Sequence, residues 1–265
     1  MSPQPLPPSQ PLPPPPTRPD DTRWFARPRP VPEPRLRLFC VPHVGGGGAA
    51  FNSWPAHLPH DVELCAIRFP GRENRLHEQP VEDLDTLLDQ LLPAIAPWLD
   101  RPFALLGHCS GSVIAFALAR RLRALGGPRP VLLVVSSTAA PSNRVIGSPL
   151  HEAPRDELLA QVVAFGGMAP QILGDPDLMA LYETVIRADY RVVERVTYAR
   201  QPPLDIPITV IGGRDDTFVG CAEMAGWYAE TTRAFTLHLI EGGHFILPDA
   251  GPVVGGLVRG MAVDG

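Results

Sequence analysis

The stretch Phe103–Leu125, FALLGHCSGSVIAFALARRLRAL, decides the fold. It begins with a short apolar run, passes through Gly107-His108-Cys109-Ser110-Gly111, and continues with apolar residues three and four positions apart, which predicts a helix. A strand, a tight turn and a helix in this order expose the central residue of the turn above the edge of a sheet. Cys109 is therefore the candidate nucleophile.

Ser110 is the alternative nucleophile in this segment. If Ser110 were the central residue, His108 and Ser112 would occupy the flanking positions, where the turn needs small residues. Only Cys109 has glycine on both sides, so we favour Cys109. In that frame the backbone N–H of Ser110 lies where an oxyanion donor belongs.

Apolar runs and helical stretches alternate on both sides of this segment. The runs typical of strands are 36–41, 62–69, 103–106, 131–136, 208–211 and 235–240. Strands separated by helices predict the α/β class, with a mostly parallel central sheet covered by helices on both faces.

The alternation breaks between about 147 and 203. Two or three helices are expected there: one at about 155–165, one at about 175–187, and a third, if it is separate, at 188–196. Gly166-Gly167 and Gly174-Asp175-Pro176 divide them. Helices without an intervening strand cannot extend the sheet, so we expect this insertion to form a helical lid.

The N-terminal segment has a different composition. Residues 1–34 contain 14 of the 34 prolines and few apolar residues, which predicts a disordered Pro-rich tail. Trp24 and Phe25 are its only aromatic residues and are expected to attach its end to the body. The catalytic domain is expected to span 35–265.

Composition narrows the function classes. The net charge of −5 and the absence of a basic run argue against a nucleic-acid partner, and no apolar stretch approaches the roughly 18 residues of a membrane span. The four cysteines form neither a disulfide framework nor a CxxC metal motif. We expect a cytoplasmic monomer with no metal and no cofactor of its own.

A cysteine nucleophile needs a base and an orienting acid, and α/β-hydrolase folds supply them in the order nucleophile, acid, histidine. His244 follows the last strand run, in Glu241-Gly242-Gly243-His244-Phe245. The spacing Gly-x-x-Asp-x-x-Val after the run 208–211 selects Asp216 as the acid, with Asp215 as a weaker candidate. Asp216 would hold the imidazole in the correct tautomer.

The loop after the first strand run is rich in glycine. It reads Pro42-His43-Val44 followed by Gly45–Gly48. Four consecutive glycines fit neither GxGxxG nor GxxxxGK[ST], which argues against a dinucleotide or phosphate loop. We expect the N–H of Val44 to be the second oxyanion donor.

The chain resembles the stand-alone type II thioesterases of nonribosomal peptide and polyketide assembly lines. The resemblance covers Leu38 to Leu247, without the tail. Its segments are FCVPHVGGGG (39–48), FPGRENR (69–75), DRPFALLGHCSG (100–111), LHEAPRDEL (150–158), FGGMAPQIL (165–173), IRADYRVVE (186–194), PPLDIPITVIGGRDD (202–216) and GGHFIL (242–247). It implies a substrate held as a thioester on the 4′-phosphopantetheine of an acyl or peptidyl carrier protein, and a mobile lid over the acyl chamber.

The chain departs from this family at the nucleophile. The family typically reads Gly-His-Ser-Met-Gly, whereas this chain has Cys109 and Ser110. An engineered serine replacement would explain Cys109 but not Ser110. A cysteine at a helix N-terminus beside a histidine is expected to react as a thiolate and to form an acyl thioester.

Three functions remain open. The first is hydrolytic release of acyl or peptidyl chains through acyl-Cys109. The second is acyl transfer to an amine or another carrier thiol, because a thioester intermediate favours both acceptors. The third is a noncatalytic binding protein, against which the complete Cys-Asp-His order argues. Arg120, Arg121 and Arg123 are candidates for docking an acidic carrier, although a solvated helix face is the simpler interpretation.

Overall fold

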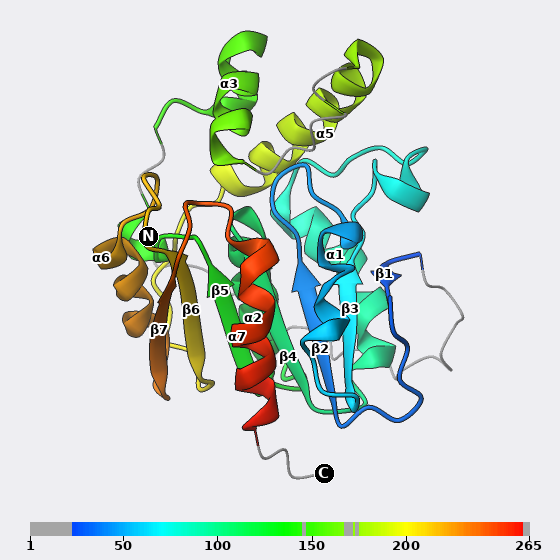
Figure 1. Ribbon diagram of the computed structural model, residues 1–265, viewed down its shortest axis with the longest axis vertical. Coiled ribbons are helices and arrows are strands. Elements are labelled where there is room, and N and C mark those ends of the chain that lie inside the picture. The colour runs from blue at the N-terminus through cyan, green and yellow to red at the C-terminus, as the bar shows by residue number, and fades with distance from the viewer. Residues whose placement is uncertain (1–22, 145–146, 167–171, 173–174, 262–265) are drawn as a thin grey trace, which may run out of the picture.

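A twisted seven-stranded sheet forms the centre of the molecule (Figure 1). The computed structural model describes residues 23–144, 147–166, 172 and 175–261. The strands are β1 (Phe25–Ala26), β2 (Leu36–Val41), β3 (Val62–Ile67), β4 (Phe103–His108), β5 (Leu132–Ser136), β6 (Ile208–Gly213) and β7 (Phe235–Ile240). Their order is β1-β3-β2-β4-β5-β6-β7, and every neighbouring pair is parallel except β1 with β3. The expected α/β fold with a mostly parallel sheet is confirmed.

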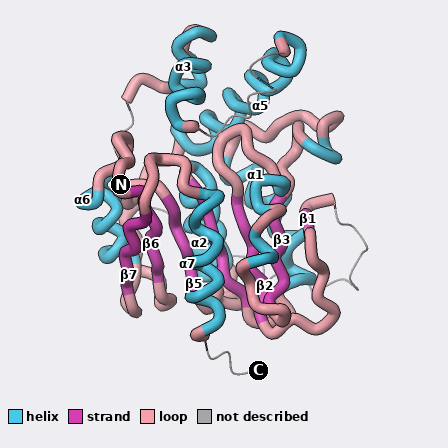
Figure 2. The backbone as a smooth tube through the Cα atoms, viewed as in Figure 1, coloured by secondary structure: helices cyan, strands magenta, loops and turns pink. Residues whose placement is uncertain are grey.

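Helices cover both faces of this sheet, as Figure 2 shows. The α-helices of the domain are α1 (Leu84–Ile95), α2 (Ser110–Ala124), α6 (Cys221–Ala225) and α7 (Leu247–Arg259). The 3-10 helices are η1 (Gly48–Phe51), η2 (Trp54–Ala56), η3 (Glu73–Arg75), η4 (Ala96–Trp98), η5 (Pro141–Asn143), η6 (Leu150–Glu152) and η7 (Gly226–Glu230). Within the described ranges, no helix is long and apolar enough to cross a membrane.

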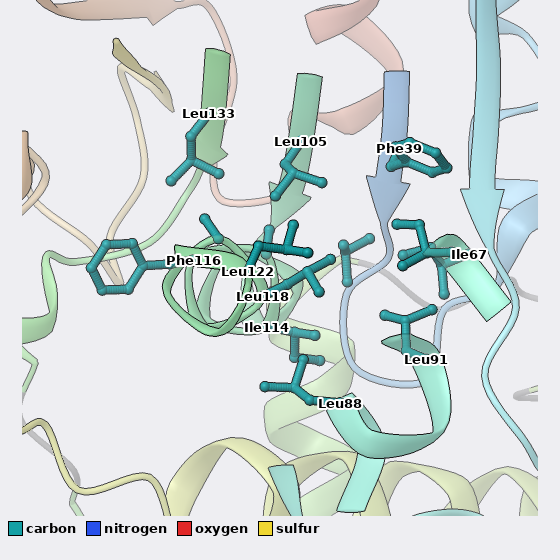
Figure 3. Close-up of a cluster of buried hydrophobic side chains, with 14 of the residues drawn as sticks. Phe39, Ile67, Leu88, Leu91, Leu105, Ile114, Phe116, Leu118, Leu122 and Leu133 are labelled. Carbon is teal, nitrogen blue, oxygen red and sulfur yellow. The ribbon is translucent and has the colours of Figure 1, made fainter. Parts of the chain in front are cut away.

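The two faces of the sheet belong to separate cores. In β2, Phe39 and Val41 point into the core under α1 and α2, whereas Leu38 and Cys40 point into the core under α7. This alternation is the two-residue period of a strand. Figure 3 shows the first core, in which leucines of α1 and α2 meet side chains of β2, β4 and β5. Close packing on both faces fixes the position at which β4 passes into α2.

The N-terminal boundary differs from the expectation. Residues 23–34 belong to the folded domain and not to the tail, because Phe25–Ala26 pairs antiparallel with β3. Trp24 and Phe25 are buried, and the guanidinium of Arg75 lies 3.8 Å from the Trp24 ring centroid. These two side chains supply the apolar surface that the proline-rich sequence lacks. The rest of the expected tail, residues 1–22, lies outside the described residues.

Two helices of the insertion lie above the carboxyl edge of the strands (Figure 1). They are α3 (Arg155–Phe165) and α5 (Pro176–Glu194). Of the two or three helices expected, a separate third helix at 188–196 is wrong, because α5 continues to Glu194 with no glycine or proline after its first residue. Leu158, Val162, Ile186 and Tyr190 form a small core between α3 and α5. Val192 and Val193, at the end of α5, join the main core and anchor the lid.

Candidate active site

Cys109 lies at the sharp turn between β4 and α2. Its φ of +52° and ψ of −120° are strained for a residue with a side chain. A Cβ on Gly107 would lie 2.3 Å from the carbonyl oxygen of Gly111, and a Cβ on Gly111 would lie 2.3 Å from that of Val41. Both contacts are with backbone, which cannot retreat, so the two flanking positions require glycine.

Short hydrogen bonds hold this turn in place. The N–H of Cys109 donates to the carbonyl of Ser136 at 2.8 Å, and Thr138 Oγ1 donates to the carbonyl of Cys109 at 2.6 Å. Ser112 Oγ donates to the carbonyl of Gly107 at 2.8 Å and accepts from the N–H of Ser136 at 3.1 Å. No local sequence pattern indicates this role of Ser112, because it depends on the neighbouring strand β5.

The three predicted catalytic side chains lie in one hydrogen-bonded chain. His244 Nε2 is 3.3 Å from Cys109 Sγ, and His244 Nδ1 is 3.0 Å from Asp216 Oδ2. Asp216 Oδ1 accepts from the N–H groups of Phe218 and Val219 at 2.8 and 3.1 Å, so its side chain is fixed. Asp215, the weaker candidate, is exposed to solvent. The geometry favours Asp216 as the orienting acid.

Electrostatics favour the charged forms of the His–Asp pair. Burial lowers the pKa of His244, but hydrogen bonds with Asp216 and Cys109 outweigh it and raise the pKa to about 9. Burial raises the pKa of Asp216, but the hydrogen bond with His244 and two backbone N–H groups outweigh it, so the net pKa is lowered. Near neutral pH the pair is therefore an imidazolium and a carboxylate.

His108 is a structural neighbour of this chain. It is fully buried, its Nδ1 lies 3.0 Å from Ser136 Oγ, and its ring packs against Phe245 with centroids 5.3 Å apart. Burial lowers its pKa well below the usual value, with smaller contributions from His43 and His244. His108 is therefore neutral and supports the floor of the site.

The two predicted oxyanion donors line the same cavity as the nucleophile. Val44 and Ser110 line a cavity of about 500 Å³ together with Cys109 and His244. Ser110 is the first residue of α2, where backbone N–H groups point out of the helix and favour negative charge. The turn that carries Val44 is closed by a hydrogen bond from the N–H of Gly46 to the carbonyl of His43 at 2.9 Å.

The lid forms the opposite wall of this cavity. Phe165 of α3 and Tyr190, Val193 and Glu194 of α5 line it. A second cavity of about 420 Å³ shares Val113, Ala139, Arg144 and Glu194 with the first. The site therefore combines a cysteine on a sharp turn with a chamber large enough for an acyl chain.

The structure brings together two further residues to which the sequence assigned no role. Arg72 and Asp189 form a buried ion pair behind the glycine-rich turn. Both lie in segments of the family resemblance, but 117 residues separate them. No local pattern could have paired them.

The three arginines considered for docking already have partners. Arg121 pairs with Asp85 and Asp89, Arg123 donates to the carbonyl of Pro202 at 2.7 Å, and Arg120 lies over the Phe116 ring. Their intramolecular contacts favour the simpler interpretation of a helix face. In the described ranges, no group of three or more histidine, cysteine, aspartate or glutamate side chains could hold a metal ion.

Comparisons with known proteins identify the family of the chain. Residues 36–255 match the thioesterase domain family. The chain is 34% identical to the gramicidin S biosynthesis protein GrsT of Aneurinibacillus migulanus, over 85% of this chain and 88% of that protein. The solved type II thioesterase BorB, from the borrelidin biosynthetic cluster, is similar with a TM-score of 0.80 and 34% identity over 89% of this chain and 96% of BorB. YbtT, a type II thioesterase of the yersiniabactin pathway, gives a TM-score of 0.78 and 25% identity over 89% and 97%. The chain has the α/β-hydrolase fold and belongs to the thioesterase family, which makes it a thioester hydrolase.

Proposed function

We propose that this protein is a type II thioesterase that releases acyl or peptidyl chains from the phosphopantetheine arm of carrier proteins through a covalent intermediate on Cys109. One observation carries the proposal. The hydrogen-bonded chain Cys109–His244–Asp216 opens into a lid-covered cavity of about 500 Å³. The relatives named for nonribosomal peptide and polyketide pathways support carrier proteins as partners.

The first half-reaction forms the acyl-enzyme. The thiolate of Cys109 attacks the carbonyl carbon of the carrier thioester, and the N–H groups of Val44 and Ser110 stabilise the oxyanion. When the bond from this carbon to the carrier sulfur breaks, His244 donates its Nε2 proton to the leaving thiolate. Asp216 keeps the proton on Nδ1 throughout.

The second half-reaction returns the enzyme to its starting state. Neutral His244 takes a proton from water, and the oxygen attacks the acyl carbon on Cys109. The bond from this carbon to Sγ breaks, so that a free acid leaves and Cys109 becomes a thiolate beside the imidazolium again. One water is consumed for each thioester cleaved.

A specific observation favours acyl transfer as the second candidate function. The nucleophile is a thiol, so the intermediate is a thioester that is close in free energy to the carrier-bound donor. A serine enzyme would instead hold an oxoester. An amine or the thiol of a second carrier can then replace water, with His244 accepting the proton of either nucleophile.

Product analysis with acyl-loaded carrier tests both functions. Wild type is expected to release free acid from the carrier, and Cys109→Ala is expected to release none above the uncatalysed rate. An added amine or second carrier should divert part of the acyl group in wild type but much less in Cys109→Ser. Full activity of Cys109→Ala would overturn the proposed function, and identical product ratios in wild type and Cys109→Ser would overturn the transfer candidate.

A further inference from the structure

A buried ion pair joins the lid helix α5 to the segment after β3. Arg72 Nη1 lies 2.7 Å from Asp189 Oδ2, and Arg72 Nη2 lies 2.6 Å from Asp189 Oδ1. Only 7% and 13% of the two side chains are exposed. Removing two charges from water is costly unless further hydrogen bonds satisfy them. The remaining partners of this pair are therefore informative.

Those partners are the backbone of the glycine-rich turn. The N–H of Gly45 donates to Asp189 Oδ2 at 2.8 Å, and Arg72 Nη1 donates to the carbonyl of Gly46 at 2.9 Å. The ion pair thus binds the N–H of Gly45 and the carbonyl of Gly46, two consecutive residues of the turn. Gly45 has a φ of +72°, and a Cβ on it would lie 3.1 Å from Ile186 Cγ1, so α5 also packs directly on the turn.

The held residues directly follow Val44. The N–H of Gly46 donates to the carbonyl of His43 at 2.9 Å, and this carbonyl belongs to the same planar peptide unit as the Val44 N–H. Fixing Gly45 and Gly46 therefore restricts the orientation of the Val44 N–H. An oxyanion donor acts only if it is aimed in advance at the position of the developing charge. The ion pair lies near the end of α5 that Val192 and Val193 anchor in the core, so its own position is fixed.

We propose that Asp189, held by Arg72, is a positioning residue for the oxyanion hole. Through it the lid helix keeps the turn His43–Gly46 in the conformation that acylation of Cys109 needs. The proposal rests on the proposed function, in which Val44 is an oxyanion donor. It makes α5 a support of the catalytic machinery as well as a wall of the acyl chamber.

Two reactions of the Cys109 thiol distinguish a positioning role of Asp189 from a role in stability alone. Acylation of Cys109 by a thioester passes through an oxyanion, whereas alkylation by iodoacetamide does not. Both require the Cys109 thiolate and an intact fold. Both rates would be measured by intact mass spectrometry in a Cys221→Ser background, because Cys221 is exposed whereas Cys40 and Cys65 are buried.

The variants are Asp189→Ala, Asp189→Asn and Glu183→Gln. Asp189→Ala is expected to slow acylation about 10- to 100-fold, since displacing a catalytic donor by about 1 Å has effects of that size, and to leave alkylation within about twofold of wild type. Asp189→Asn keeps an acceptor for the Gly45 N–H and should fall between Asp189→Ala and wild type. Glu183, the matched control, also lies on α5 but pairs with Arg187 and Arg155 of the lid, so Glu183→Gln should change neither rate.

The outcomes distinguish the two proposals. If wild type is alkylated but never acylated at Cys109, the proposed function fails. If wild type is acylated and Asp189→Ala is acylated equally fast, the positioning role is wrong. If both reactions slow by the same factor in Asp189→Ala and in Asp189→Asn, the pair has only a structural role, which also overturns the proposal.

Discussion

Replacing Asp216 by asparagine tests the hydrogen-bonded chain Cys109–His244–Asp216. Asp216 Oδ1 accepts two backbone N–H groups, so the amide oxygen of the introduced asparagine should take that position and leave its amide nitrogen facing His244. The amide N–H would then donate to Nδ1, and the single imidazole proton would move to Nε2. A histidine protonated there cannot accept the proton of Cys109.

The magnitude follows from the electrostatics of the buried pair. The pKa of His244 is raised from 6.5 to about 9, which corresponds to about 3 kcal/mol in favour of the imidazolium. Asp216 supplies the larger hydrogen-bond contribution to this increase. Losing it should lower the pKa of His244, since burial of the ring remains and only the contributions of Cys109 still raise the pKa. Together with the wrong tautomer, we expect acylation at pH 7 to fall about 10²- to 10⁴-fold.

Rapid-quench mass spectrometry of Cys109 acylation measures this loss, and NMR titration of the His244 ring measures the pKa. Asp215→Asn is the matched control, because Asp215 is adjacent but exposed. It should leave both quantities close to wild type. If folded Asp216→Asn is acylated at a rate within about threefold of wild type, Asp216 does not orient His244 as described.

Three further predictions concern stability and are measured by denaturant unfolding. Gly111→Ala should destabilise the fold by several kcal/mol or prevent folding, because its Cβ would lie 2.3 Å from the carbonyl oxygen of Val41. The control is Gly256→Ala, on an open face of α7, which should be neutral or stabilise the fold by about 0.5–1 kcal/mol. Equal effects of the two would contradict the steric account of the turn. Ser112→Ala should lower the free energy of unfolding by about 1–3 kcal/mol, because it leaves the buried Gly107 carbonyl and Ser136 N–H without this partner. The control Ser142→Ala, at an exposed serine, should lower it much less. A Ser112→Ala variant as stable as wild type would contradict the role of Ser112 in holding the turn. The raised pKa of His244 stabilises the folded state fully below pH 6.5, and this contribution is lost as pH rises through about 9. In a Cys109→Ser background, where position 109 does not titrate, the stability advantage of His244 over the His244→Gln change should shrink as pH rises from about 6.5 to 9. A constant difference would be evidence against the charged pair.

The central strands and the sharp turn at Cys109 could be predicted because the residues that determine them lie within each segment. The run 36–41 is β2 itself, and the glycines around Cys109 are required by backbone contacts within the same turn and with β2. His244 and Asp216 could be selected because each follows a strand whose carboxyl end lies at the same edge of the sheet.

Other features depend on contacts between distant segments. Phe25–Ala26 is too short to show a strand period, and its pairing with β3 decides its structure. Arg72 and Asp189 meet only after α5 packs over the glycine-rich turn, and Ser112 acquires its role from β5. The sequence left open whether 188–196 is a separate helix, and the structure shows that residues 188–194 continue α5.

The identity of the nucleophile is the central claim, and peptide mapping after a rapid quench tests it most directly. Wild-type protein would be mixed with acyl-loaded carrier, quenched before turnover is complete, digested, and analysed for the residue that carries the acyl group. We predict the acyl mass on Cys109, and no acyl mass on this peptide in Cys109→Ala. An acyl group on Ser110, or turnover without any adduct at Cys109, would contradict the account.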